Sequence, residues 1–210
     1  MSAQFAVLLP VKPPARGKSR LVGIDSGQRA TLARAFALDT AEACLATARV
    51  AEVLVVTDDA IFADEVGALG CAAIPDGVSG DMNGTLRLAA AEAARRWPGL
   101  VPVALCGDLP ALRPSDLDAA LGSIDPGTTA FVGDAEGTGT TLYTAAAAAF
   151  DPRFGPGSRA AHEDAGAKAV DGELVSLRHD VDTIDDLRDV RRLGLGPRTE
   201  LAILTARVEL

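Results

Sequence analysis

Four basic side chains are gathered in the segment PVKPPARGKSRL, residues 10–21, of a 210-residue chain whose formal net charge is −9. They are Lys12, Arg16, Lys18 and Arg20. The segment follows the apolar run FAVLLPV, residues 5–11, which is typical of a buried strand. Loops that follow the first strand of an α/β sheet often hold phosphates. We therefore expect Lys12, Lys18 and Arg20 to face an anionic ligand and Arg16 to face solvent, although loop cations that are merely solvated remain the alternative.

This basic segment carries neither of the common glycine-rich phosphate motifs. It has no GxxxxGK[ST] pattern, which would indicate a P-loop, and no GxGxxG pattern, which would indicate dinucleotide binding. The sequence therefore predicts a small phosphorylated ligand that is held in another way.

Acidic residues follow two further apolar segments. Asp108 lies in GDLP after the run VPVALC, residues 101–106, and Asp180 and Asp182 lie in the segment GELVSLRHDVDT, residues 172–183, which is expected to be a strand. Alternate residues of a strand share a face, and carboxylates together with substrate phosphates are the usual ligands of Mg²⁺. These three residues are candidate metal ligands, but Asp108 as a turn or cap residue and Asp182 as a helix N-cap are the alternatives.

Two glycine-rich segments offer further places for an anion. GTGTT, residues 137–141, and RFGPGSRAA, residues 153–161, have glycines that free the backbone to present N–H groups. Ser158 is expected to open a helix, where its hydroxyl would either contact an anion or simply cap the helix. Together with the basic segment, these loops predict two anionic ligands.

Composition excludes several functional classes. An acidic chain is a poor partner for nucleic acid, which is normally met by an excess of Lys and Arg. His162 and His179 have no clustered partners, so a zinc site or a serine-hydrolase triad is not expected. The cysteines are widely spaced among apolar residues and are expected to be small core residues; they are Cys44, Cys71 and Cys106.

No apolar run approaches the roughly 20 residues that span a membrane. The run at residues 5–11 is also too short for a signal sequence. We therefore expect a cytoplasmic protein without a membrane contact.

Short apolar runs alternate with helical patterns, which predicts a three-layer α/β/α sandwich with a mostly parallel, mixed sheet in a single domain over residues 1–210. Ser26 is expected to cap the first helix. The short link at 135–139 favours antiparallel pairing of the strands on either side. Strands are expected at 5–11, 52–57, 71–75, 101–106, 128–134, 140–146 and 172–183, and helices at 27–48, 58–70, 85–97, 114–121, within 150–167 and at 184–196.

Five short motifs occur in an order and spacing that resemble a known family. They are PVKPPARGKSRL, GDLPAL, GTGT, FDPRFGPGS and DVDT. They resemble those of the phosphoenolpyruvate/2-phospholactate guanylyltransferases, which belong to the biosynthesis of coenzyme F-420. The resemblance extends from about residue 5 to 197 and leaves the tail from Arg198 outside it.

The resemblance implies a nucleotidyltransferase (GT-A-like) fold, similar to that of molybdenum-cofactor guanylyltransferases. It also implies that GTP and phosphoenolpyruvate react to give enolpyruvyl-2-diphospho-5'-guanosine and pyrophosphate. By the same resemblance Thr140, Gly155 and Ser158 contact phosphoenolpyruvate, and Asp108 and Asp180, with Asp182 nearby, bind Mg²⁺. The family often has a polar residue where this chain has Gly157. A transient contact with the next enzyme of the pathway is a further expectation.

The expected chemistry needs no side-chain base, because the attacking phosphate oxygen is already ionised at neutral pH. Alignment and charge neutralisation by Lys12, Lys18, Arg20 and the metal would suffice. Asn83 is either a contact of the guanosine or an ordinary polar loop residue.

Other acceptors and other functions are also compatible with the sequence. The acceptor could instead be 2-phospholactate or 3-phosphoglycerate. Glycosyl transfer through DVD is a weaker alternative, because DVD lies near the end of the chain, after GDLP and the glycine-rich loops. A molybdenum-cofactor transferase is also weaker, because its glycine-rich first loop differs from PVKPPARGKSRL. A GTP-binding sensor without catalysis belongs to a different functional class.

Overall fold

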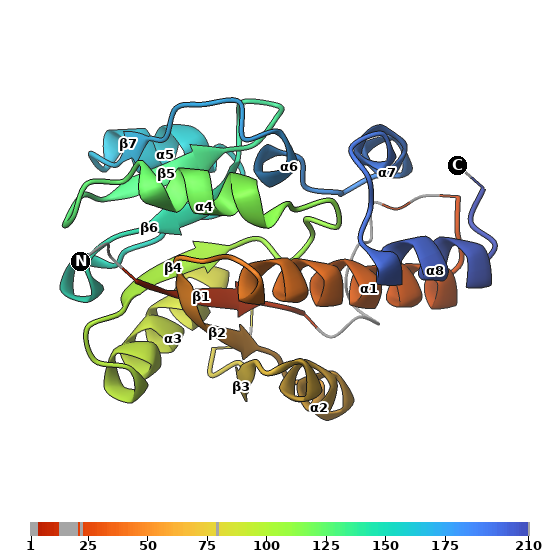
Figure 1. The fold of residues 1–210 in the computed structure, drawn as a ribbon, viewed down its shortest axis with the longest axis horizontal. Helices are drawn as coiled ribbons and strands as arrows, with labels where there is room; N and C mark the ends of the chain where they lie inside the picture. Colours follow the sequence, from red (N-terminus) through yellow and green to blue (C-terminus); the bar gives the residue numbers. More distant parts are fainter. Residues whose placement is uncertain (1–3, 13–20, 22, 79, 210) are drawn as a thin grey trace.

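The structure is a computed structural model that describes residues 4–12, 21, 23–78 and 80–209 (Figure 1). Within these residues one seven-stranded sheet has the order β3-β2-β1-β4-β6-β5-β7. The strands are β1 (Phe5–Pro10), β2 (Val50–Val56), β3 (Ala72–Ile74), β4 (Val101–Leu105), β5 (Ala130–Gly133), β6 (Thr140–Thr144) and β7 (Lys168–Ala169).

Strand directions confirm the mixed, mostly parallel sheet. β1 pairs in parallel with β2 and β4, and β2 pairs in parallel with β3. β6 runs antiparallel to β4 and to β5, as the short link between β5 and β6 predicted. β7 then pairs in parallel with β5. The reversal at β6 lets the chain place a second group of loops beside the end of β4.

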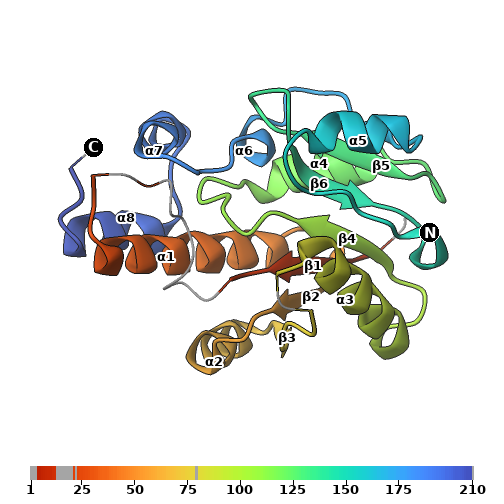
Figure 2. The same cartoon turned by 180° about the vertical axis from the view of Figure 1, so that it is seen from behind.

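Helices cover both faces of the sheet, as the alternation of side chains along β1 requires. Phe5, Val7 and Leu9 pack into one apolar cluster with residues of α1, α2, α4 and α6, while Ala6 and Leu8 pack into a second cluster with α3. α3 and α5 lie in front of the sheet in Figure 2. The helices are α1 (Ser26–Leu45), α2 (Ala60–Leu69), α3 (Met82–Arg96), α4 (Pro114–Gly122), α5 (Ser158–Asp164), α6 (Val175–Arg178), α7 (Ile184–Arg191) and α8 (Pro197–Thr205).

Two helix starts differ from expectation. α1 is capped by Asp25 rather than Ser26, through a capping box in which Asp25 and Gln28 bond to each other's backbone N–H. α3 begins at Met82, three residues early, because the Asp81 side chain accepts a hydrogen bond from Gly84 N and caps it. In the described part of the chain no helix is long and apolar enough to cross a membrane.

The predicted strand at residues 172–183 is wrong. That segment holds the short helix α6, and the place beside β5 is taken by β7. Side-chain contacts override the strand pattern: the backbone N–H and the hydroxyl of Ser176 both donate to Asp116, at 3.0 and 2.7 Å. The Arg178 guanidinium donates to four main-chain carbonyls, those of Gly133, Val170, Gly172 and Glu173. These bonds fix the segment as a turn of helix instead of a strand.

The tail beyond the family motifs forms α8, which packs along α1 (Figure 1). α8 has no capping side chain of its own; the buried Asp39 of α1 accepts hydrogen bonds from the backbone N–H groups of Arg198 and Thr199, at 3.1 and 2.8 Å. Burial raises the pKa of Asp39, and the bonds from Thr199 and Arg198 oppose that rise. A Cβ on Gly196 would lie 2.2 Å from the Asp39 Cγ, so only glycine fits there.

Asp39→Asn should lower the free energy of unfolding by about 1–3 kcal/mol. The carboxylate accepts one hydrogen bond on each oxygen, whereas the amide has a single oxygen and its N–H₂ group would face a backbone N–H that needs an acceptor. Urea denaturation at neutral pH measures this loss. Asp185→Asn is the matched control: Asp185 is exposed and pairs with Arg188 on the surface, so its loss should cost less than about 1 kcal/mol. Equal stability of the two variants would contradict the capping role of Asp39.

Candidate functional site

The candidate site is a cleft of about 690 Å³ at the carboxyl ends of β1 and β4. This is the edge at which open α/β sheets bind ligands. Seven of the residues singled out from the sequence line it: Lys12, Asp108, Thr140, Gly155, Ser158, Asp180 and Asp182. Lys18 and Arg20, as well as Arg16, lie outside the described residues.

Asp108 is held at the cleft by hydrogen bonds to the main chain around it. The N–H of Val181 donates to the Asp108 carbonyl at 3.0 Å, so Asp108 is tied to the residue between Asp180 and Asp182. The N–H of Leu109 donates to the hydroxyl of Thr40 in α1 at 3.1 Å. The first bond brings Asp108 next to a segment whose acids are 72 or more positions away in the chain, and the second anchors the residue after Asp108 to α1.

Asp182 is not the cap of the following helix. Thr183 caps α7, and the Asp186 carboxylate accepts hydrogen bonds from the N–H groups of Asp182 and Thr183, at 3.0 and 2.7 Å. The capping alternative for Asp182 is therefore wrong. Asp180 and Asp182 both line the cleft although their segment is not a strand.

The turn between β5 and β6 presents Thr140 to the cleft. The Asp134 carboxylate accepts hydrogen bonds from the N–H groups of Thr138 and Gly139, at 3.0 and 2.8 Å. A Cβ on Gly139 would lie 2.3 Å from Asp134 Oδ2, which explains the second glycine of GTGT. Thr140 then begins β6 as a buried residue at the cleft wall.

The loop before α5 brings Gly155 and Ser158 to the same cleft. Gly155 and Gly157 have φ of 136° and 70°, a region that L side chains rarely adopt. Gly157 occupies the N-cap position, so Ser158 is the first helical residue and not the cap. The N–H of Ser158 donates to the Gly155 carbonyl at 3.0 Å, which closes the loop, and Ser158 itself is buried.

The described wall of the cleft is strongly acidic. Ten carboxylate residues line it against one lysine, Lys12. The ten are Asp58, Asp76, Asp81, Asp108, Asp134, Glu136, Asp180, Asp182, Asp186 and Asp189. A phosphorylated ligand can lie against such a wall only if cations stand between the two. Carboxylate oxygens are hard donors that suit a small divalent cation.

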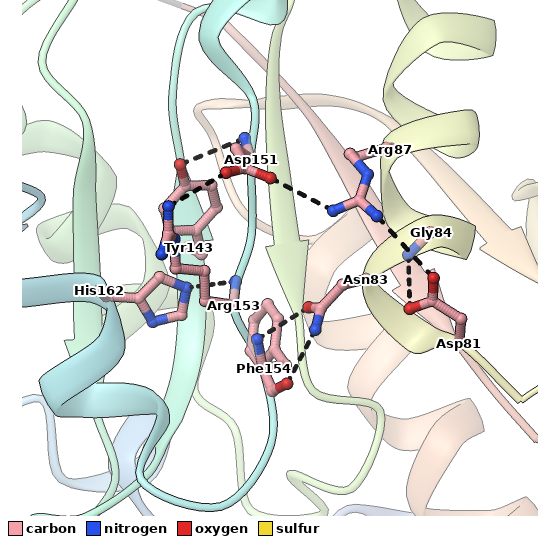
Figure 3. Close-up of polar contacts among 9 residues, drawn as sticks. All are labelled: Asp81, Asn83, Gly84, Arg87, Tyr143, Asp151, Arg153, Phe154 and His162. Carbon is pink, nitrogen blue, oxygen red and sulfur yellow. Dashed lines mark hydrogen bonds and ion pairs between the residues drawn. The ribbon is translucent and has the colours of Figure 1, made fainter. Parts of the chain in front are cut away.

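Asn83 lies outside the lining of the main cleft. It borders a neighbouring hollow of about 460 Å³, together with Arg87, Asp151 and Phe154 (Figure 3). Its amide makes two bonds to the backbone of Phe154: the nitrogen donates to the carbonyl at 2.9 Å and the oxygen accepts from the N–H at 2.8 Å. The structure thus uses Asn83 to tie the loop before α5 to the start of α3, and its contact with a nucleotide stays a prediction.

His162 was not singled out from the sequence, yet it lies fully buried beside the cleft. Its ring nitrogens contact Thr140 Oγ1 and the backbone N–H of Arg153, at 3.0 and 2.9 Å. Burial lowers its pKa to about 4. Thr140 and Arg153 are 22 and 9 residues away from His162 in the chain, so no local pattern signals that it joins them.

The chain is similar over nearly its whole length to proteins of known name. No family model matches the chain. The phosphoenolpyruvate guanylyltransferase of Thermomonospora curvata is 47% identical over 207 residues, which cover 97% of this chain and 90% of the relative. The enzyme of the same name from Streptomyces scabiei is 48% identical over 206 residues, which cover 95% of each chain.

Solved structures share the fold at low identity. A protein of Desulfovibrio desulfuricans assigned to the nucleotide-diphospho-sugar transferases superposes with a TM-score of 0.70 at 18% identity, covering 98% of this chain and 96% of the other. Rv0371c of Mycobacterium tuberculosis, solved with manganese, superposes with a TM-score of 0.53 at 20% identity, covering 90% and 98%. These likenesses confirm the nucleotidyltransferase fold, and the sequence identities to the curated relatives show that the chain belongs to the phosphoenolpyruvate guanylyltransferase family.

Proposed function

We propose that this enzyme transfers the guanylyl group of GTP to the phosphate of phosphoenolpyruvate, giving enolpyruvyl-2-diphospho-5'-guanosine and pyrophosphate. The observation that carries the proposal is that one cleft is lined by both kinds of group that the reaction needs: carboxylates for a metal, at Asp108 and Asp180, and the glycine-rich loops with Thr140 and Ser158 for an anion. The names of the curated relatives support the same substrates. We further propose that the reaction is a step of coenzyme F-420 biosynthesis in the cytoplasm.

A divalent cation, Mg²⁺ in our proposal, fits the donor set of the cleft. Asp108 and Asp180 would bind it, with Asp182 nearby in the lining of the same cleft. Among the described residues, no group of three or more His, Cys, Asp or Glu side chains is arranged to hold an ion by itself. Mg²⁺ is commonly bound by one or two carboxylates, with phosphate oxygens and water completing its shell. When bound, the ion would neutralise charge on the transferring and leaving phosphates.

The chain's own residues would orient two anions that repel each other. Thr140, Gly155 and Ser158 are assigned to the phosphorylated acceptor, whose ionised phosphate oxygen attacks the α-phosphorus of GTP as the bond to pyrophosphate breaks. Lys12, with Lys18 and Arg20 of the same segment, is assigned to the charge that develops on pyrophosphate. A preorganised contact of this type contributes about 2–4 kcal/mol to transition-state stabilisation.

Purified protein with Mg²⁺, GTP and phosphoenolpyruvate should release pyrophosphate and form a product with the mass of the guanylylated acceptor. A panel that crosses ATP, CTP, UTP and GTP with phosphoenolpyruvate, 2-phospholactate and 3-phosphoglycerate measures the specificity. Faster turnover with another acceptor would replace phosphoenolpyruvate in the proposal. Binding of GTP without turnover of any acceptor would favour a sensor.

Asp108→Asn and Asp180→Asn should each lower kcat by about 10²–10³-fold, because each keeps the shape of the side chain but removes a charge from the metal site. Stopped-flow or coupled assays of pyrophosphate release measure the loss, and thermal unfolding checks that the fold is intact. Asp185→Asn, an exposed acid outside the cleft lining, is the control and should turn over normally. Wild-type rates in both cleft variants would remove the metal-site assignment.

Ser158→Ala should raise the KM for phosphoenolpyruvate by about 10-fold, which corresponds to about 1.4 kcal/mol, and leave the KM for GTP nearly unchanged. The reason is that the hydroxyl is assigned to the acceptor alone. Initial rates with each substrate varied in turn separate the two constants. Ser123→Ala, which removes a hydroxyl bonded to the Ala120 carbonyl of α4, is the control. An equal rise in both KM values would show that Ser158 does not serve the acceptor specifically.

A further inference from the structure

The ring of His162 lies over an aromatic pair on the sheet. Phe131 of β5 and Tyr143 of β6 are cross-strand partners, and the imidazole stacks on both, with ring centroids 5.6 and 4.7 Å away and interplanar angles of 23° and 22°. Phe154 contacts the ring edge-on, with centroids 5.6 Å apart. Packing on these sides fixes the plane of the imidazole, and with it the direction in which each ring nitrogen points (Figure 3).

The hydrogen-bond partners determine where the single proton of the ring lies. The backbone N–H of Arg153 can only donate, so Nε2 of His162, 2.9 Å away, must accept. In a neutral imidazole the proton is then on Nδ1. The Nδ1–H group therefore faces Thr140 Oγ1, 3.0 Å away, as a donor, and the hydrogen bond between the ring and the Ser158 carbonyl, which can only accept, likewise requires a ring N–H.

The neutral state of the ring is secured by its surroundings. Burial lowers the pKa of His162 to about 4; the Arg153 guanidinium also lowers it, while the Ser158 carbonyl and the Asp151 carboxylate raise it. The stacked Tyr143 has a raised pKa, because of burial, and adds no charge. At neutral pH the ring thus keeps one donor and one acceptor.

This arrangement determines whether the Thr140 hydroxyl donates or accepts a hydrogen bond at the cleft. Because the oxygen of that hydroxyl accepts from His162, its hydrogen must be donated elsewhere, and Thr140 lines the cleft. Phosphate and carboxylate oxygens at neutral pH are acceptors and need a donor. With the opposite tautomer, the hydroxyl would donate to Nδ1 and turn its lone pairs toward the anion.

We propose that His162 is a positioning residue, which fixes the Thr140 hydroxyl as a hydrogen-bond donor to the phosphorylated acceptor and at the same time holds the Arg153 amide of the loop that carries Gly155 and Ser158. The proposal rests on the proposed function, since it takes Thr140 and this loop as the acceptor site. His162 touches neither substrate in this account. It acts through two segments that both contact the acceptor.

Nuclear magnetic resonance of the ring nitrogens tests the tautomer in the wild-type protein, independently of activity. The chain has two histidines, so their signals are readily separated. We expect His162 to have its proton on Nδ1 and an unprotonated Nε2 at pH 7, and to gain a second proton only near pH 4. A proton on Nε2 at pH 7, or a midpoint near the ordinary pKa of about 6.5, would overturn the proposal.

A double-mutant cycle tests the action through Thr140. His162→Gln offers an acceptor near the position of Nε2 but no donor to Thr140, and it should raise the KM for phosphoenolpyruvate by about 10-fold or more while the KM for GTP changes by less than about threefold. In a Thr140→Val background the same substitution should add little, because the hydroxyl that it serves is absent. Independent, multiplicative effects would show that His162 only supports the loop and would overturn the proposal.

His162→Asn is the matched variant, since its amide nitrogen can take the place of Nδ1 and donate to Thr140. It loses the same ring stacking as His162→Gln, so thermal unfolding should show similar destabilisation. We expect its KM for phosphoenolpyruvate to lie closer to that of the wild type, whereas values equal to those of His162→Gln would count against the role of the donor. Absence of pyrophosphate release in the wild type would defeat the proposed function and leave the tautomer result standing.

Discussion

The functional site depends above all on bringing carboxylates from distant parts of the chain to one cleft. Main-chain bonds provide this: the N–H of Val181 reaches the Asp108 carbonyl, and the Leu109 N–H reaches Thr40. Like charges in one cleft repel each other, so the free energy that assembles them must come from elsewhere in the fold. It comes from the apolar packing of α1, α7 and Val181 in a third cluster beyond the sheet.

On the side of the cleft assigned to the acceptor, polar side chains hold the loops in place through hydrogen bonds. Asp134 folds the turn before β6, Asn83 holds both polar groups of Phe154, and His162 joins Thr140 to Arg153. Each of these three side chains makes two of these hydrogen bonds. Short glycine-rich motifs can bind an anion here because side chains outside the motifs restrain them, which lowers the entropy cost of ordering the loops.

The elements and site residues that short stretches of sequence determine could be predicted. The apolar runs of β1 and β4 and the short link between β5 and β6 predicted the sheet and its reversal, and GDLP predicted where an acid would meet the cleft. Prediction failed where distant contacts decide. Val175–Arg178 reads as a strand, yet Asp116, some 60 residues earlier, holds it as a helix. The role of His162 could not be predicted from the residues around it in the sequence. Phe131 and Tyr143, on which its ring stacks, become neighbours only when β5 and β6 pair.

One contact outside the cleft constrains how the family can change over time. Asp39 and Thr40 are neighbours in α1; one holds α8, and the other holds the segment that carries Asp108. A Cβ on Gly196 would lie 2.6 Å even from the Asp39 Cβ, so replacing Asp39 by a smaller residue such as alanine would not make room for a side chain at position 196. The residue at position 39 can therefore change while Gly196 stays, at the cost of the hydrogen bonds to α8, whereas a side chain at position 196 would push α8 away from α1. Related chains that keep α8 against α1 should vary at position 39 before they vary at position 196.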